Sequence, residues 1–221
     1  MKSIWELNIA AYEAIRKNIR AGATEIDVYN TVSKAFDKLA NRSVHFVCDI
    51  ISGERGAGVE GQPTDSVLLE GDALIVDILP EYGGVYSDTT RTFFIGMPTE
   101  KHKNVYAALL EALRAGEREI REGQSADRLY TIVRDSIDRS GFRGLFPHHA
   151  GHRVGMECLM EPDFVEGNQG KLEAGMIVTL EPGIYIPGHF GIRLEDNYLV
   201  TETGYEKCYD YPLDIEYFIL K

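Results

Sequence analysis

Four acidic residues lie on apolar stretches of the kind that form buried β-strands, and one histidine lies between them in the chain. The acidic residues are Asp77, Asp88, Glu181 and Glu195, and the histidine is His152. Burying a carboxylate is costly unless something cationic meets it. Four carboxylates and one imidazole are a suitable ligand set for a pair of divalent metal ions.

The chain repeats part of its own pattern at a spacing of roughly 100 residues. Gly22 ends the run Ile-Arg-Ala-Gly, and Gly123 ends the run Ile-Arg-Glu-Gly 101 positions later. Gly71 and Gly175 each lie six residues before an acidic strand end. These matches predict two structural halves, and a metal site between them would draw ligands from both.

The composition is ordinary for a globular protein, with 221 residues, 44% hydrophobic and 26% charged. This length is enough for one domain over residues 1–221 with a substantial core. The formal net charge of −12 argues against nucleic acid as a partner. Part of that excess is the acidic set, which bound cations would neutralise.

The cysteines and the N-terminus bear on location. Cys48, Cys158 and Cys208 are odd in number and scattered, with no zinc-thiolate spacing. The first residues do not form a signal peptide, and no apolar run approaches transmembrane length. We therefore expect a reduced, cytoplasmic protein that does not associate with membranes.

Periodicity predicts two helices followed by strands, and then the same order again. Helical spacing marks residues 3–20 and 101–121, and Thr24 and Ser125 are suitable N-caps for two further helices. Strands are expected at 44–52, 73–79, 85–94, 152–159, 176–183, 190–200 and 205–219. The fold class is therefore α+β, with two pseudo-symmetric ααβββ halves and an antiparallel sheet covered on one face by four helices.

Four motifs in this order resemble a known family. The two aspartates are eleven residues apart, and the runs Gly-His-Arg-Val-Gly (151–155), Leu-Glu-Pro-Gly-Ile-Tyr (180–185) and Gly-Ile-Arg-Leu-Glu-Asp (191–196) follow. Nearly the whole chain is similar to the pita-bread superfamily of methionine aminopeptidase, aminopeptidase P, prolidase and creatinase. The resemblance is closest to the catalytic domain of the Xaa-Pro peptidases.

This resemblance implies a pita-bread fold and a dinuclear metal site. Asp88 and Glu195 would bridge two metals, Asp77 would chelate one, and His152 with Glu181 would hold the other. Oxygen-rich ligation with one imidazole favours manganese, cobalt or iron, with zinc a further candidate. The alternative is that these acids pair with arginines in ordinary surface networks.

Two more residues match the Xaa-Pro branch of the family. His148 stands where a histidine contacts substrate, and Arg193 would support the site or the substrate. The alternative for His148 is a half-buried loop histidine bonded to a backbone carbonyl. His149 and His189 have no matching position, and we interpret them as loop residues.

The chain also departs from the family at positions near the substrate. Glu60 and Leu159 stand where the family usually has histidines, and Leu79 and Arg153 stand where it favours glycine. Losing a donor to the developing charge typically costs about 10²–10³ in rate. Glu60 could serve as a proton carrier or as an anchor for a cationic substrate, or it could be a solvated loop acid.

Three functions fit these observations. The first is a dinuclear-metal hydrolase of the Xaa-Pro peptidase type, in which a hydroxide between the metals attacks a peptide or small amide. In this hypothesis Glu181 is ligand and proton shuttle, and His148 and Glu60 contact substrate. The others are a catalytically silent binding module and a metal-independent hydrolase of the creatinase type. We favour the first because buried metal ligands are costly to keep without a metal.

The remaining expectations concern size and assembly. Full-length aminopeptidase P and prolidase carry an N-terminal domain that we do not expect in this chain. An exposed sheet edge could support a homodimer.

Overall fold

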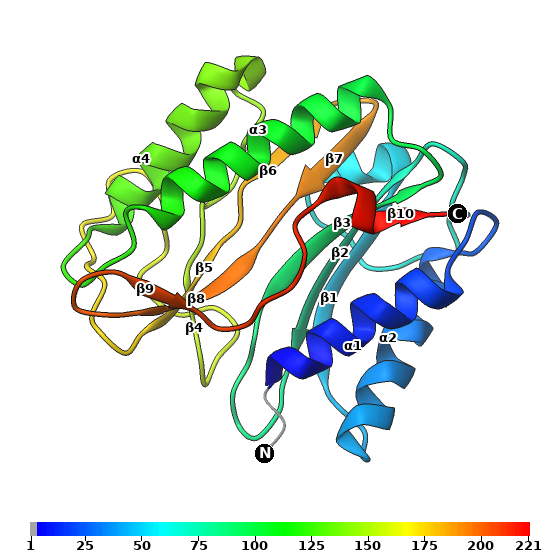
Figure 1. Cartoon of the computed structure of the whole chain (residues 1–221), viewed down its shortest axis with the longest axis horizontal. Coiled ribbons are helices and arrows are strands. Elements are labelled where there is room, and N and C mark those ends of the chain that lie inside the picture. The colour runs from blue at the N-terminus through cyan, green and yellow to red at the C-terminus, as the bar shows by residue number, and fades with distance from the viewer. Residues whose placement is uncertain (1–3) are drawn as a thin grey trace.

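The computed structural model describes residues 4–221 and shows two halves that each open with a pair of helices. The first half contains α1 (Ile4–Asn18), α2 (Glu25–Ala40), β1 (Phe46–Ser52), the 3₁₀ turn Gly53–Gly58, β2 (Ala73–Pro80) and β3 (Thr89–Ile95). The second half contains α3 (Glu100–Glu117), α4 (Ala126–Ile137), β4 (Arg153–Val154), β5 (Ile177–Leu180), β6 (Gly183–Ile186), β7 (Phe190–Arg193), β8 (Asp196–Val200) and β9 (Tyr205–Lys207). A final strand, β10 (Ile219–Leu220), returns to the first half beside β3. The helix pairs lie on opposite sides of the strands in Figure 1.

The strands form three sheets that meet between the helix pairs. The first has the order β1-β2-β3-β10, the second β4-β5-β8-β9, and β6 pairs with β7 alone. All pairings are antiparallel except that of β10 with β3. A bridge between Thr90 and Glu195 joins the two halves, so the predicted α+β class with antiparallel sheets is confirmed. Among residues 4–221, no helix combines the length and apolarity needed to cross a membrane.

The two predicted N-caps are confirmed and are equivalent in the two halves. The Thr24 hydroxyl accepts from the Asp27 N–H, and the Asp27 carboxylate accepts from the Thr24 N–H in return. The Ser125 hydroxyl accepts from the Arg128 N–H. Such bonds satisfy N–H groups that the first turn of a helix leaves unpaired.

Strand β2 is buried along its length because both of its faces are covered. Leu74, Val76 and Ile78 pack into the core with α1 and α2. Ile75 packs on the opposite face against Tyr185 of β6. Because side chains alternate along a strand, the sheet face that carries Ile75 also carries Asp77.

The second half differs from the expected strands, and the differences place the acidic residues. The strand expected at 176–183 is interrupted between β5 and β6, and the one at 190–200 between β7 and β8. Glu181 and Glu195 lie at these interruptions. The strand expected at 152–159 is wrong beyond Val154, because the Gly155 N–H bonds within a local turn to the Glu157 carbonyl.

The strand expected at 205–219 is wrong for most of its length. Only Tyr205–Lys207 (β9) and the first residue of β10 belong to strands within it, and a 3₁₀ turn occupies Ile215–Phe218. Pro212 lies between them and has no N–H to give to a sheet.

Gly151→Ala tests how closely β5 approaches the segment that carries His152. A Cβ on Gly151 would overlap the Thr179 carbonyl oxygen, and its φ of +152° disfavours side chains. We expect the free energy of unfolding to fall by about 3 kcal/mol, measured by urea denaturation. Gly155→Ala is the matched control, because that Cβ would meet only Met160 Sδ at 3.4 Å. An equal loss in both variants would contradict this account.

Candidate metal centre and active-site cleft

The structure brings all five predicted metal ligands to one buried place where the halves meet. Ligand atoms of Asp88, His152 and Glu195 all lie within 4.8 Å of one another. His152 Nε2 is 3.2 Å from Asp88 Oδ2 and 3.6 Å from Glu181 Oε1. These groups come from the start of β3, the start of β4 and the two interruptions in the second half.

The orientation of His152 suits a metal ligand. Its Nδ1 lies 2.9 Å from the Arg153 carbonyl oxygen, so Nδ1 carries the proton and donates it. Nε2 then presents its lone pair to the carboxylates. A hydrogen bond from the second ring nitrogen is the usual way that proteins fix a metal-binding histidine.

Asp77, the fifth predicted ligand, is held differently. Its Oδ2 accepts a 2.7 Å hydrogen bond from Arg193 Nη2, and both residues are buried. The same guanidinium nitrogen lies 3.4 Å from Asp49 Oδ2 on the neighbouring strand β1. Asp77 therefore pairs with an arginine, as in the alternative interpretation, but the pair is buried and is not part of a surface network. Arg91, the other arginine near these acids, pairs with Asp196.

The site contains carboxylate oxygens for which the protein supplies no partner. Asp77 Oδ1, Asp88 Oδ1 and Glu195 Oε1 are buried without a hydrogen bond among the described residues. Burial raises the pKa of Asp77 to about 6. Burial, together with neighbouring carboxylates, raises the pKa of Asp88 and of Glu195 well above the ordinary values. Buried polar atoms of this kind normally have partners, and divalent cations would satisfy all three.

Glu181 has a different environment, because three imidazoles surround it. Its Oε1 is 3.2 Å from His149 Nε2, and its Oε2 is 3.9 Å from His148 Nδ1. Burial would raise the pKa of Glu181, but the hydrogen bond to His149 and the nearby imidazoles outweigh burial and lower it to about 2. His148, His149 and Glu181 form a second group of potential ligands.

His149 lies in a loop, as expected, but its side chain reaches Glu181, which the sequence reasoning did not predict. No ligand spacing marks His149 in the sequence. The one available signal was its position in a His-His pair just before the glycine-histidine motif.

His148 lines the cleft, but both of its ring nitrogens already have protein partners. Nδ1 is 2.7 Å from the His149 carbonyl oxygen and Nε2 is 2.9 Å from the Tyr185 hydroxyl. Burial lowers the pKa of His148 to about 4, so the ring is neutral at pH 7. Since Arg193 donates to the Tyr185 oxygen, the Tyr185 hydroxyl donates to Nε2 and Nδ1 donates to the carbonyl. The carbonyl bond expected in the alternative interpretation of His148 is present.

Two residues that the sequence reasoning missed support the Asp88 backbone, Asn197 directly and Trp5 through Asn197. Asn197 Oδ1 accepts from the Asp88 N–H at 3.2 Å, and Asn197 Nδ2 donates to the Asp88 carbonyl at 2.5 Å. Trp5 of α1 donates its indole N–H to the same Asn197 oxygen at 2.8 Å. The Thr90 hydroxyl donates to Glu195 Oε2 at 2.8 Å. These bonds place the acids before any ligand arrives.

These groups line a cleft with a volume of about 330 Å³. Glu60 and Leu159 line it as well, and both are exposed, so they lie toward its mouth. Val47 and the buried Leu79 add further apolar lining. The two positions at which the family usually has histidine thus border the cleft that holds the acids.

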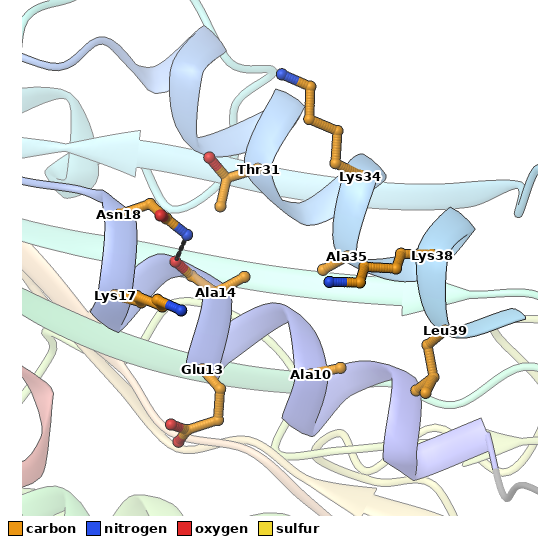
Figure 2. Close-up of a pocket in the computed structure, with 10 residues that line it drawn as sticks. All are labelled: Ala10, Glu13, Ala14, Lys17, Asn18, Thr31, Lys34, Ala35, Lys38 and Leu39. Atoms are coloured by element: carbon orange, nitrogen blue, oxygen red, sulfur yellow. Dashed lines mark hydrogen bonds between the residues drawn. The ribbon is translucent and has the colours of Figure 1, made fainter.

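A larger hollow lies elsewhere, between α1 and α2, with a volume of about 990 Å³ (Figure 2). Its lining is mostly small and basic, with Lys17, Lys34 and Lys38 and the single acid Glu13. No histidine lines it, and it lacks the converging carboxylates of the smaller cleft. The chemistry therefore points to the smaller cleft as the candidate site.

Comparisons with known proteins place the chain in a family. Residues 1–202 match the model of metallopeptidase family M24. The chain belongs to metallopeptidase family M24. It is 36% identical to an Xaa-Pro dipeptidase from Bacillus anthracis, with a TM-score of 0.92 over 97% of this chain. It is 32% identical to a prolidase from Pyrococcus furiosus, with a TM-score of 0.90 over 95% of this chain.

The family M24 relatives are longer than this chain. A probable dipeptidase of Mycobacterium bovis is 39% identical over 184 residues, which is 83% of this chain and 49% of that protein. The chain covers 60% of the Bacillus anthracis structure and 62% of the Pyrococcus furiosus structure. It therefore spans about half to two-thirds of the length of these relatives.

The raised pKa of Asp77 predicts how the metal-free protein responds to pH. A raised pKa in the folded state gives stability that is present near pH 4 and is lost as the pH rises through about 6. Asp77→Asn keeps a neutral side chain throughout. We therefore expect the stability of this variant relative to wild type to increase, on the order of 2 kcal/mol, between pH 4 and 7.

Urea unfolding in the presence of a chelator measures this difference. Asp65→Asn is the control, because Asp65 is exposed and does not line the cleft. A difference between Asp77→Asn and wild type that does not change with pH would contradict the prediction.

Proposed function

We propose that this M24 chain is a metal-dependent hydrolase of the Xaa-Pro peptidase type that cleaves a peptide or small amide bond. The observation that carries this proposal is the set of unpartnered carboxylate oxygens on Asp77, Asp88 and Glu195, buried beside His152. Mutually repelling acids in a buried place are costly to maintain without a cation. The names of the similar dipeptidase and prolidase agree with this class of reaction.

The residues present fit two divalent metals. Asp88 and Glu195 would bridge them, Asp77 would hold one, and His152 with Glu181 would hold the other. Manganese, cobalt and iron suit a set of four carboxylates and one imidazole, and zinc is a further candidate. When bound, such a pair supplies an activated water and polarises the substrate carbonyl.

The residues around the proposed metal ligands orient these ligands and balance their charge. Arg193 orients Asp77 through a 2.7 Å bond and holds Tyr185, which in turn orients His148. Glu181 would be a ligand and the proton shuttle of this proposal. Its lowered pKa of about 2 keeps it ionised, so it would accept a proton from the attacking water and pass it toward the leaving nitrogen, with His149 Nε2 at 3.2 Å as its partner. His148 borders the substrate with its ring.

The substrate is not a standard one in this proposal. Glu60 and Leu159 border the cleft at positions where Xaa-Pro peptidases usually have imidazole donors. Leu159 has no donor, so stabilisation of the developing charge must come from the metals and from His149 or Arg193. We therefore expect slower turnover of generic Xaa-Pro dipeptides than of substrates matched to this cleft.

One observation favours a second candidate, a catalytically silent binding module. Asp77 already has a cationic partner in Arg193, which reduces the need for a metal at that acid. The three unpartnered oxygens favour the hydrolase. Metal binding without turnover of any peptide or amide would favour the binding module.

Asp88→Asn tests the hydrolase proposal. Removing a bridging carboxylate should lower kcat/KM by at least about 10²-fold. Even the loss of a residue that only hydrogen-bonds to a metal ligand can reduce activity by that factor. The assay is hydrolysis of Xaa-Pro dipeptides and small amides with added Mn²⁺, Co²⁺, Fe²⁺ or Zn²⁺. Glu100→Gln on α3 is the matched control, because that side chain is 83% exposed and outside the cleft.

The two functions give different results. Turnover that is unchanged in Asp88→Asn, or that persists after chelation, would contradict the metal-dependent mechanism. Wild-type protein that binds Mn²⁺ but cleaves nothing in the panel would contradict the hydrolase and leave the binding module.

A further inference from the structure

Glu60 lies at the mouth of the cleft without a partner of its own. Among residues 4–221 its side chain makes no hydrogen bond and no ion pair, although it lines the same cavity as Asp88 and His148. The cationic groups that line this cavity are already engaged. Arg193 is bonded to Asp77 and Tyr185, and the imidazoles of His148 and His149 contact Tyr185 and Glu181.

The backbone before Glu60 is held in a strained conformation. Val59 has φ +75° and ψ −56°, and the Glu60 N–H donates to the Gly58 carbonyl at 3.0 Å. This geometry is a γ-turn, which is rare and costly for a β-branched residue. Backbone strain of this kind persists only where the surroundings enforce it.

The surroundings that enforce it belong to the candidate site. Arg193 Nη1 donates to the Val59 carbonyl at 2.9 Å, and the Val59 side chain packs with Ile75 and Tyr185. On the other side, the Gly61 N–H donates to Asp49 Oδ1 at 3.0 Å. The residues flanking Glu60 are thus tied to the groups that hold Asp77, so the position of Glu60 is fixed relative to the acids.

Apolar side chains also line the cleft mouth, next to the exposed Gln62. Val47 and Leu159 are 44% and 54% exposed and line the same cavity, and the buried Leu79 lies deeper. A side chain that combines an aliphatic stem with a terminal cation would cover the apolar lining and reach the Glu60 carboxylate. Lysine-like and arginine-like groups have this chemistry.

We propose that Glu60 is a specificity-determining residue that selects substrates carrying a positively charged side chain next to the scissile bond. This inference rests on the proposed hydrolase function of the same cleft. An ion pair with an exposed carboxylate supplies about 1 kcal/mol at most, which corresponds to about fivefold in kcat/KM.

The test compares Lys-Pro with norleucine-Pro, which has the same stem and no charge. We expect the ratio of kcat/KM values for Lys-Pro over norleucine-Pro to be about five in wild type and near one in Glu60→Gln. Glu54→Gln is the matched control, because Glu54 is an exposed acid on the 3₁₀ turn that precedes Glu60 and does not line the cavity. Glu54→Gln removes the same charge as Glu60→Gln but outside the cavity. It should therefore keep the wild-type ratio.

A ratio near one in wild type, or a preference that survives in Glu60→Gln, would overturn the inference. A binding measurement separates this failure from failure of the hydrolase proposal. Calorimetry of Lys-Pro and norleucine-Pro binding to Asp88→Asn requires no turnover. A Lys-Pro preference there that Glu60→Gln removes would support the role of Glu60 even if no peptide were cleaved, and equal binding of the two dipeptides would contradict it.

Discussion

The arrangement of this protein depends on the mutual repulsion of acids that share one buried place. Asp77, Asp88 and Glu195 each leave an oxygen without a partner, and burial raises the pKa of all three. In the absence of a cation such a group opposes folding. The packing around it must therefore offset the free energy that burying these acids costs. Two hydrophobic cores, one under each helix pair, enclose the acids and provide that stability.

Arg193 connects the parts of the site. It neutralises Asp77, donates to the hydroxyl of Tyr185 and bonds the Val59 carbonyl in the strained turn before Glu60. A planar guanidinium can make these bonds together because its donors point in fixed directions, which a lysine could not reproduce. Arg193 thereby positions Asp77, His148 (through Tyr185) and the turn before Glu60.

Much of this organisation could be predicted from the sequence, because it is local or periodic. The caps at Thr24 and Ser125 follow from side-chain chemistry within one helical turn. The apolar run that ends at Asp77 and the motif around His152 were recognisable from order and spacing alone. The two halves were visible as self-similarity.

The rest depends on contacts between distant residues, which no local pattern encodes. Trp5 and Asn197, which hold the Asp88 backbone, are 192 positions apart. The pairing of Arg193 with Asp77 spans 116 positions and gives a predicted metal ligand an ion-pair partner as well. The strand interruptions at Glu181 and Glu195 likewise arise from the way the second half folds against β3, which the alternation of residues does not reveal.

The roles of individual site residues remain predictions. The most direct test is whether metal ions bind among the buried acids. Crystals grown with Mn²⁺ and measured at the manganese absorption edge would locate the metal by anomalous scattering. The account predicts two peaks about 3.5–4 Å apart between the carboxylates of Asp88 and Glu195. Crystals with the Arg193–Asp77 pair intact and no peak among these acids would contradict it.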